Sequence, residues 1–141
     1  MSGSGWIDQQ IKLDALTDAI QRASTIGLDT EFVRVSTFHP RPGLIQIALD
    51  GVAYLIDPLS NLDLSELGHV FTGSTMSILH AAQEDYEVLF RLTGSIPTPV
   101  FDTQIAYALL NDKISLSLSA LVTELLGKEL SKEETRSDWT K

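Results

Sequence analysis

Three acidic residues have the types and spacing that could bind divalent metal ions. Asp29 and Glu31 lie two residues apart in the largely apolar run 26–33. Alternation along a strand would put both carboxylates on one face, about 6–7 Å apart. Asp85 follows the apolar run 76–79, at a point where a strand would pass into a helix. Since Mg²⁺ and Mn²⁺ prefer oxygen ligands, these carboxylates could hold metal ions for phosphodiester hydrolysis.

An Asp-x-Glu pair on a strand is a weak signal when taken alone. Edge strands often carry charges that face water, so a solvated surface pair is the alternative for Asp29 and Glu31. Their apolar neighbours Leu28 and Phe32 make a fully solvated strand harder to accept. If strand 76–79 runs beside them, Asp85 would lie in the first turn of the next helix, near this pair. Ligand sites of α/β sheets favour such strand-to-helix crevices.

The elements that position these acids can be read from hydrophobic periodicity and turn residues. Asp50-Gly51 is a strong hairpin signal, Pro40, Pro42 and Gly43 predict a loop, and Gly127 is placed to end a helix. We expect helices over 11–24, 62–71, 82–92, 103–111 and 117–126, and strands over 26–33, 44–49, 52–56, 76–79 and 100–101. This order predicts an α/β domain with a mixed five-stranded sheet, an antiparallel meander plus parallel strands, flanked by helices. Residues 1–5 fit either a flexible native start or a non-native addition, and the polar stretch from Lys128 is expected to be a loop or tail.

Composition narrows the class of protein. The 141 residues suit a single domain, and the absence of cysteine excludes disulfides, thiolate catalysis and cysteine-bound zinc. A cytoplasmic location is the default expectation, since neither a signal peptide nor a membrane-spanning apolar run is visible. The net charge of −9 argues against holding nucleic acid by overall charge. Arg34, His39 and Arg41 form the local basic patch near the acids, and either a phosphate guide or an ordinary solvated loop fits them.

Several segments, in the same order, resemble the ribonuclease D family of 3′–5′ exonucleases. Residues 28–34, Leu-Asp-Thr-Glu-Phe-Val-Arg, are similar to its first exonuclease motif, and residues 42–48 are similar to the strand that follows it there. Residues 56–58, 80–85 and 101–106 continue the likeness. Residues 135–139 are similar to the segment that leads into the family's last motif. The resemblance covers nearly the whole chain.

The resemblance implies a ribonuclease H-like exonuclease domain over residues 1–141 that removes nucleotides from RNA 3′ ends, in the class that matures transfer RNA precursors. It implies two Mg²⁺ or Mn²⁺ ions, with Asp29 bridging both, Glu31 on the nucleophile side and Asp85 on the second ion. It places Phe32 and Val35 against the terminal nucleotide, with His80 nearby; a histidine at a strand end is also often just hydrogen-bonded in place. Gln46 and Asp102 would support the core or the edge of the site. DNA is not excluded as a substrate.

The sequence departs from the family pattern at its last motif, a Tyr followed four residues later by an Asp. Tyr86 and Tyr107 have Phe90 and Asn111 at that spacing. We therefore expect an exonuclease domain that is incomplete at its C-terminus, lacks the C-terminal helix and hydrolyses RNA weakly. An uncovered C-terminal face would favour a homodimer. The alternative function is a catalytically impaired module that binds nucleic acid or protein.

Overall fold

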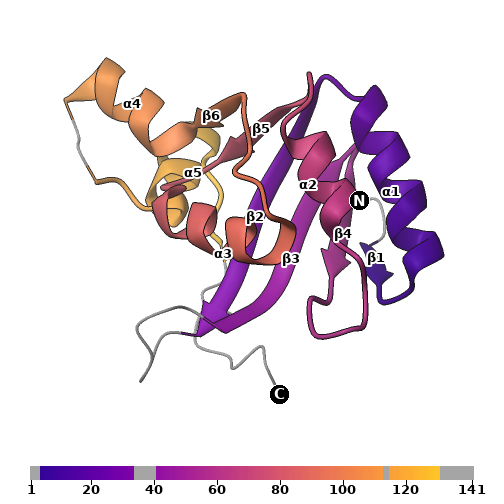
Figure 1. Ribbon diagram of the computed structural model, residues 1–141. Helices are drawn as coiled ribbons and strands as arrows, with labels where there is room; N and C mark the ends of the chain where they lie inside the picture. The colour runs from indigo at the N-terminus through magenta and orange to yellow at the C-terminus, as the bar shows by residue number, and fades with distance from the viewer. Residues whose placement is uncertain (1–3, 34–40, 113–114, 131–141) are drawn as a thin grey trace.

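The computed structural model describes residues 4–33, 41–112 and 115–130, which form one twisted sheet with helices on both sides (Figure 1). The strands are β1 (Ser4–Ile7), β2 (Thr25–Val33), β3 (Arg41–Leu49), β4 (Val52–Ile56), β5 (Met76–Leu79) and β6 (Val100–Asp102). The helices are α1 (Gln10–Arg22), α2 (Ser65–Phe71), α3 (Gln83–Thr93), α4 (Thr103–Asn111) and α5 (Leu118–Leu126).

The six strands lie in the order β1-β4-β3-β2-β5-β6. β2, β3 and β4 form an antiparallel meander, and the pairs β1–β4, β2–β5 and β5–β6 are parallel. The predicted mixed α/β sheet is therefore confirmed, but the expected number of five strands is wrong. β1 was missed because its short, glycine- and serine-containing sequence carries little strand signal. It becomes a strand by pairing with β4, about 50 residues away along the chain.

The β2–β3 pairing contains an irregularity beside the predicted acidic pair. Glu31 lies opposite Leu44, whereas Phe32 lies opposite Pro42, so Gly43 is the extra residue of a bulge. Bulges accommodate proline and glycine within a strand and locally change its direction. The loop predicted from Pro40, Pro42 and Gly43 is thus corrected in part, since β3 already begins at Arg41.

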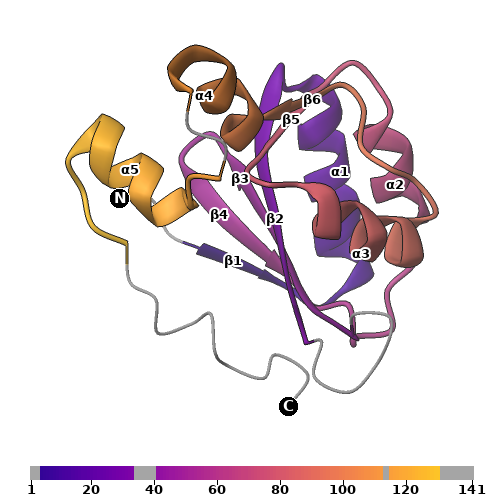
Figure 2. The ribbon, with the colours of Figure 1, turned by 90° about the vertical axis from the view of Figure 1, so that its left-hand side faces the viewer.

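One face of the sheet carries the hydrophobic core. Figure 2 shows α1, α2 and α3 on this face, with α5 on the opposite side of the sheet. Side chains with 0–1% exposure come from α1, the central strands, α2 and α3, among them Ile20, Ile45, Ile47, Leu67 and Leu89. Burial of each such side chain stabilises the fold by about 1.5–3 kcal/mol before chain entropy is counted. This packing places α3, and with it Asp85, against β2.

Within the described ranges, no helix combines the length and the apolar character that crossing a bilayer would require.

Candidate active site

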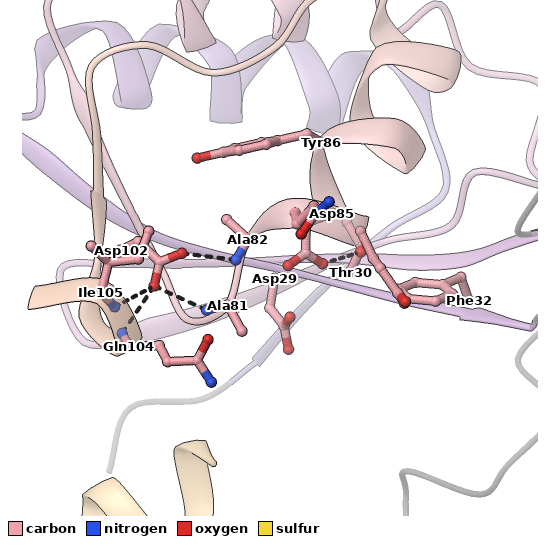
Figure 3. Close-up of a pocket in the computed structure, with 12 residues that line it drawn as sticks. Asp29, Thr30, Phe32, Ala81, Ala82, Asp85, Tyr86, Asp102, Gln104 and Ile105 are labelled. Atoms are coloured by element: carbon pink, nitrogen blue, oxygen red, sulfur yellow. Dashed lines mark hydrogen bonds between the residues drawn. The ribbon is translucent and has the colours of Figure 1, made fainter. Parts of the chain in front are cut away.

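A cleft opens where β2 extends past its parallel neighbour. β2 pairs with β5 only from Thr25 to Gly27, but it continues to Val33. β5 ends at Leu79, and the chain then turns through residues 80–82 into α3. The resulting cleft has a volume of about 650 Å³ and lies between β2, the start of α3 and the β6–α4 junction (Figure 3). Its lining includes Asp29, Thr30, Phe32, Asp85, Tyr86, Asp102 and Gln104.

Two of the three predicted acids, Asp29 and Asp85, line this cleft. Asp29 is exposed on β2, and Asp85 lies in the first turn of α3, as predicted, where it is only 5% exposed. The buried Thr30 hydroxyl donates a hydrogen bond to Oδ1 of Asp85. Neighbouring residues of a strand point to opposite faces, yet Asp29 and Thr30 both reach the cleft because it opens at the edge of β2.

The cleft disfavours negative charge on both acids. Burial raises the pKa of Asp85 to about 6 against the lowering effect of the Thr30 hydroxyl, and the charge of Asp29 raises it further. Although part of Asp29 is exposed, the surrounding protein desolvates its carboxyl group and raises its pKa, against the lowering effects of a hydrogen bond from the Thr30 backbone and of nearby His80. A bound cation would relieve this unfavourable charge. Desolvated carboxylates that face one cleft therefore have the donor chemistry that a hard divalent cation needs.

Glu31, the third predicted acid, is half-buried on β2 and directly opposite Leu44. Strand alternation would put its side chain on the same face as that of Asp29. The residues that the structure describes contain no group of three or more Asp, Glu or His side chains that could hold a metal ion. Mg²⁺ is commonly held by one or two carboxylates together with water and substrate phosphate, so the pair Asp29 and Asp85 fits such an ion. The assignment of Glu31 as a ligand stays a prediction.

His80 has both ring nitrogens occupied by protein partners. Nδ1 lies 2.8 Å from the Thr103 hydroxyl, and Nε2 lies 2.8 Å from the Leu116 carbonyl oxygen. Because a carbonyl oxygen only accepts hydrogen bonds, Nε2 carries a hydrogen. Together with Asp29 and Leu118, His80 also lines a smaller cavity of about 350 Å³. These bonds favour a histidine held in place, and its predicted contact with substrate is untested.

The other predicted site residues lie in different parts of the chain. Phe32 is half-buried and lines the cleft, and its contact with a nucleotide stays a prediction. Val35, His39 and Arg34 lie outside the described residues. Gln46 is half-buried and pairs directly with Asp29 across β2 and β3, and its supporting role stays a prediction.

Sequence reasoning missed two contributors to the cleft, Thr30 and Tyr86. Tyr86 is half-buried and lines the cleft, and its pKa is raised by burial and by the charges of Asp102 and Asp85. In the sequence it stood out only as a tyrosine without an Asp four residues later. Thr30 sits between the two acids, but only the placement of α3 reveals that its hydroxyl meets Asp85.

Comparison with known proteins agrees with this architecture. Residues 5–141 match a family model described as 3′–5′ exonuclease. The chain is 47% identical to ribonuclease D of Pseudomonas paraeruginosa over 81% of its length, and 43% identical to that of Desulfotalea psychrophila over 96%. These alignments cover 31% and 34% of the relatives, so the chain spans about a third of their length.

A crystal structure of Escherichia coli ribonuclease D, described as an exoribonuclease involved in structured RNA processing, matches the whole chain with a TM-score of 0.92 and 37% identity. The match covers 38% of that protein. The parallel and antiparallel strand order described above is therefore that of a ribonuclease D core. Together with the family match over residues 5–141, it establishes that this chain belongs to the 3′–5′ exonuclease family, with ribonucleases D among its relatives.

Proposed function

We propose that this chain supplies the metal-binding part of a 3′–5′ exoribonuclease site, with Asp29, Glu31 and Asp85 as the metal-binding carboxylates. The observation that carries the proposal is that Asp29 and Asp85, far apart in sequence, line one cleft in which ionisation of each carboxyl is disfavoured. The family match supports the same reaction class. Such perturbed carboxyl groups in a cleft are typical of functional sites.

Two Mg²⁺ or Mn²⁺ ions, when bound, would supply an activated water and stabilise charge on the phosphate and on the leaving oxygen. The protein's own contribution is orientation. The Thr30 hydroxyl holds the Asp85 carboxylate by a hydrogen bond, and β2 presents Asp29 to the same cleft. Phe32 and Tyr86 offer aromatic surface in the cleft, against which an unpaired base can stack.

The proposed substrate is the 3′ end of RNA, either single-stranded or part of a structured precursor such as transfer RNA. The description of the Escherichia coli relative as a processor of structured RNA supports this choice over DNA. Because the sequence contains no Tyr followed four residues later by Asp, we propose that hydrolysis by this chain is weak. We also propose that the protein is located in the cytoplasm.

The test is shortening of 5′-labelled RNA with a free 3′ hydroxyl, in Mn²⁺, in Mg²⁺ and in EDTA. We expect slow removal of single nucleotides from the 3′ end that EDTA and Asp29→Asn abolish. Asp14→Asn is the matched control, because Asp14 carries the same charge on α1 and bonds the Gln10 side chain. The proposal fails if shortening persists in EDTA or survives Asp29→Asn, and also if RNA with a blocked 3′ end is degraded equally well.

A second candidate function is an interaction module that forms a homodimer. The observation in its favour is a group of strongly exposed leucines on α4 and α5, with exposures of 62–83%: Leu109, Leu110, Leu125 and Leu126. Exposed apolar side chains that form a continuous patch often mark interaction surfaces. Light scattering across a range of concentrations distinguishes the two candidates. A concentration-dependent dimer that Leu110→Glu disrupts, with no metal-dependent hydrolysis, would favour the interaction module.

A further inference from the structure

A single carboxylate, that of Asp102, ties together the starts of two helices beside the cleft. Its Oδ1 accepts hydrogen bonds from the backbone N–H groups of Gln104 at 2.9 Å and Ile105 at 3.3 Å, which caps α4. The same Oδ1 accepts from Ala81 at 3.0 Å, and Oδ2 accepts from Ala82 at 2.9 Å. Figure 3 shows these four bonds reaching from β6 to both segments.

The turn that Asp102 holds has a backbone that alanine seldom adopts. Ala81 has a φ of 53°, in the left-handed region where non-glycine residues are uncommon. Ala82 is 1% exposed and occupies the N-cap position of α3, where it offers no side-chain cap of its own. The turn therefore depends on partners outside its own sequence, and Asp102 supplies two of its hydrogen bonds.

The residue after Asp102 secures the other end of the same turn. The Thr103 hydroxyl lies 2.8 Å from Nδ1 of His80 and donates to the Leu79 carbonyl oxygen at 3.2 Å. Consecutive residues at the β6–α4 junction thus hold the whole stretch that connects β5 to α3. Asp85 lies three residues after Ala82, in the first turn of that helix.

The negative charge of Asp102 is stabilised by backbone N–H groups of the protein itself. Burial raises its pKa, but the four backbone N–H groups together outweigh burial and hold the pKa below its usual range. Asp102 therefore stays ionised at neutral pH. Both of its oxygens already accept hydrogen bonds from the backbone, and this arrangement suits an anchor better than a metal ligand.

We propose that Asp102 is a positioning residue for the nuclease site: its carboxylate locks the turn of residues 80–82 and thereby fixes Asp85 for metal binding. Asp102 would act through this turn and not on the reacting phosphate, because both of its oxygens already accept backbone hydrogen bonds. The inference rests on the proposed function, since its consequence is an effect on metal-dependent hydrolysis. It goes beyond that function by assigning the site's geometry to a group outside the metal-binding carboxylates.

Two substitutions distinguish the two roles of Asp102, which are to cap α4 and to hold the turn of residues 80–82. Asp102→Ser keeps the cap of α4, because serine is a good N-cap, but its short side chain cannot also reach Ala81 and Ala82. Asp102→Asn keeps an acceptor oxygen on a side chain of the same length. Asp63→Ser is the matched control, since Asp63 likewise accepts a backbone N–H bond, from Ser65 at the start of α2.

For Asp102→Ser, we expect kcat on 3′-hydroxyl RNA to fall by about 10- to 100-fold, the size typical when a group that orients a metal ligand is lost. We also expect a higher Mn²⁺ concentration for half-maximal rate and an unchanged KM for RNA at saturating Mn²⁺. Amide exchange should accelerate at Ala81 and Ala82, while Gln104 and Ile105 keep their protection. Asp102→Asn replaces one of the two acceptor oxygens by an amide nitrogen, so it should lower kcat less than Asp102→Ser and should also accelerate exchange at Ala82. Asp63→Ser should behave like the unaltered chain.

The inference is overturned if Asp102→Ser keeps the kcat and the Mn²⁺ dependence of Asp63→Ser. If Asp102→Ser shows no cooperative thermal unfolding, Asp102→Asn decides: a lower kcat with faster exchange at Ala82 supports the inference, and an unchanged kcat overturns it. Failure of the proposed function looks different, because the unaltered chain itself would then show neither Mn²⁺ binding nor hydrolysis.

Discussion

Asp85→Asn tests whether the cleft holds a carboxylate at a cost to stability, as expected of a metal ligand in a metal-free protein. Asp85 is 5% exposed, and its pKa is raised from the ordinary value of 3.8 to about 6, chiefly by burial. Asparagine has nearly the same shape, and its side-chain oxygen can accept the same hydrogen bond from the Thr30 hydroxyl. The substitution therefore removes the charge and leaves the packing almost unchanged.

Whether Asp85→Asn raises or lowers the free energy of unfolding follows from the difference in the Asp85 pKa between the folded and the unfolded chain. The folded state binds the Asp85 proton more tightly than the unfolded state does. The contribution of protonated Asp85 to the free energy of unfolding is therefore fully present below pH 3.8 and is lost as the pH rises through about 6. At about 1.4 kcal/mol per pKa unit, the ionised carboxylate costs about 3 kcal/mol at neutral pH. Asp85→Asn should thus be more stable than the unaltered chain by up to about 3 kcal/mol near pH 7.5, and by almost nothing near pH 4.

Urea denaturation in EDTA, followed by circular dichroism at several pH values, measures this difference. The comparison of pH values cancels any constant effect of the substitution, and Asp14→Asn on α1 is the control. Mn²⁺ should then stabilise the unaltered chain, by about 2.7 kcal/mol at a hundred times its Kd, and leave Asp85→Asn almost unaffected. A difference between the two proteins that stays constant from pH 4 to pH 7.5 would refute the electrostatic reasoning.

Three further substitutions test the contact between Thr30 and Asp85, the packing of α2 and the end of α5. Thr30→Val should destabilise the metal-free chain by about 1–3 kcal/mol and weaken Mn²⁺ binding, because buried Asp85 loses a donor; Thr30→Ser, assayed in the same titrations, should restore both. Gly68→Ala should cost about 1–3 kcal/mol in urea denaturation, since its Cβ would lie 2.6 Å from the Thr93 carbonyl oxygen, and a cost below that of Gly73→Ala would contradict this. Gly127→Ala should cost about 1–2 kcal/mol in the same assay, because its φ of 65° strains alanine although no atom lies within 4 Å; an unchanged stability would show that the helix end relaxes.

Much of the local structure could be predicted from the sequence, because its determinants are close together along the chain. Asp50 and Gly51 have φ values of 50° and 76°, as the predicted hairpin turn requires. The strand over residues 76–79 and the helix over 103–111 have the predicted ends. The position of Asp85 in the first turn of a helix also followed from the pattern, since a strand end and a helix start are both local signals.

Tertiary structure decided the features that depend on partners far away in the sequence. β1 exists because β4 offers it a free edge, and Pro42 and Gly43 enter β3 because a bulge accommodates them. The sequence alone identified Asp29, Glu31 and Asp85 as candidate metal ligands. It could not predict how the fold shifts the pKa values of Asp29 and Asp85. Desolvation and the bonds that Thr30 and Asp102 make are set by which surfaces pack together. Those contacts span tens of residues along the chain, beyond the reach of any local pattern.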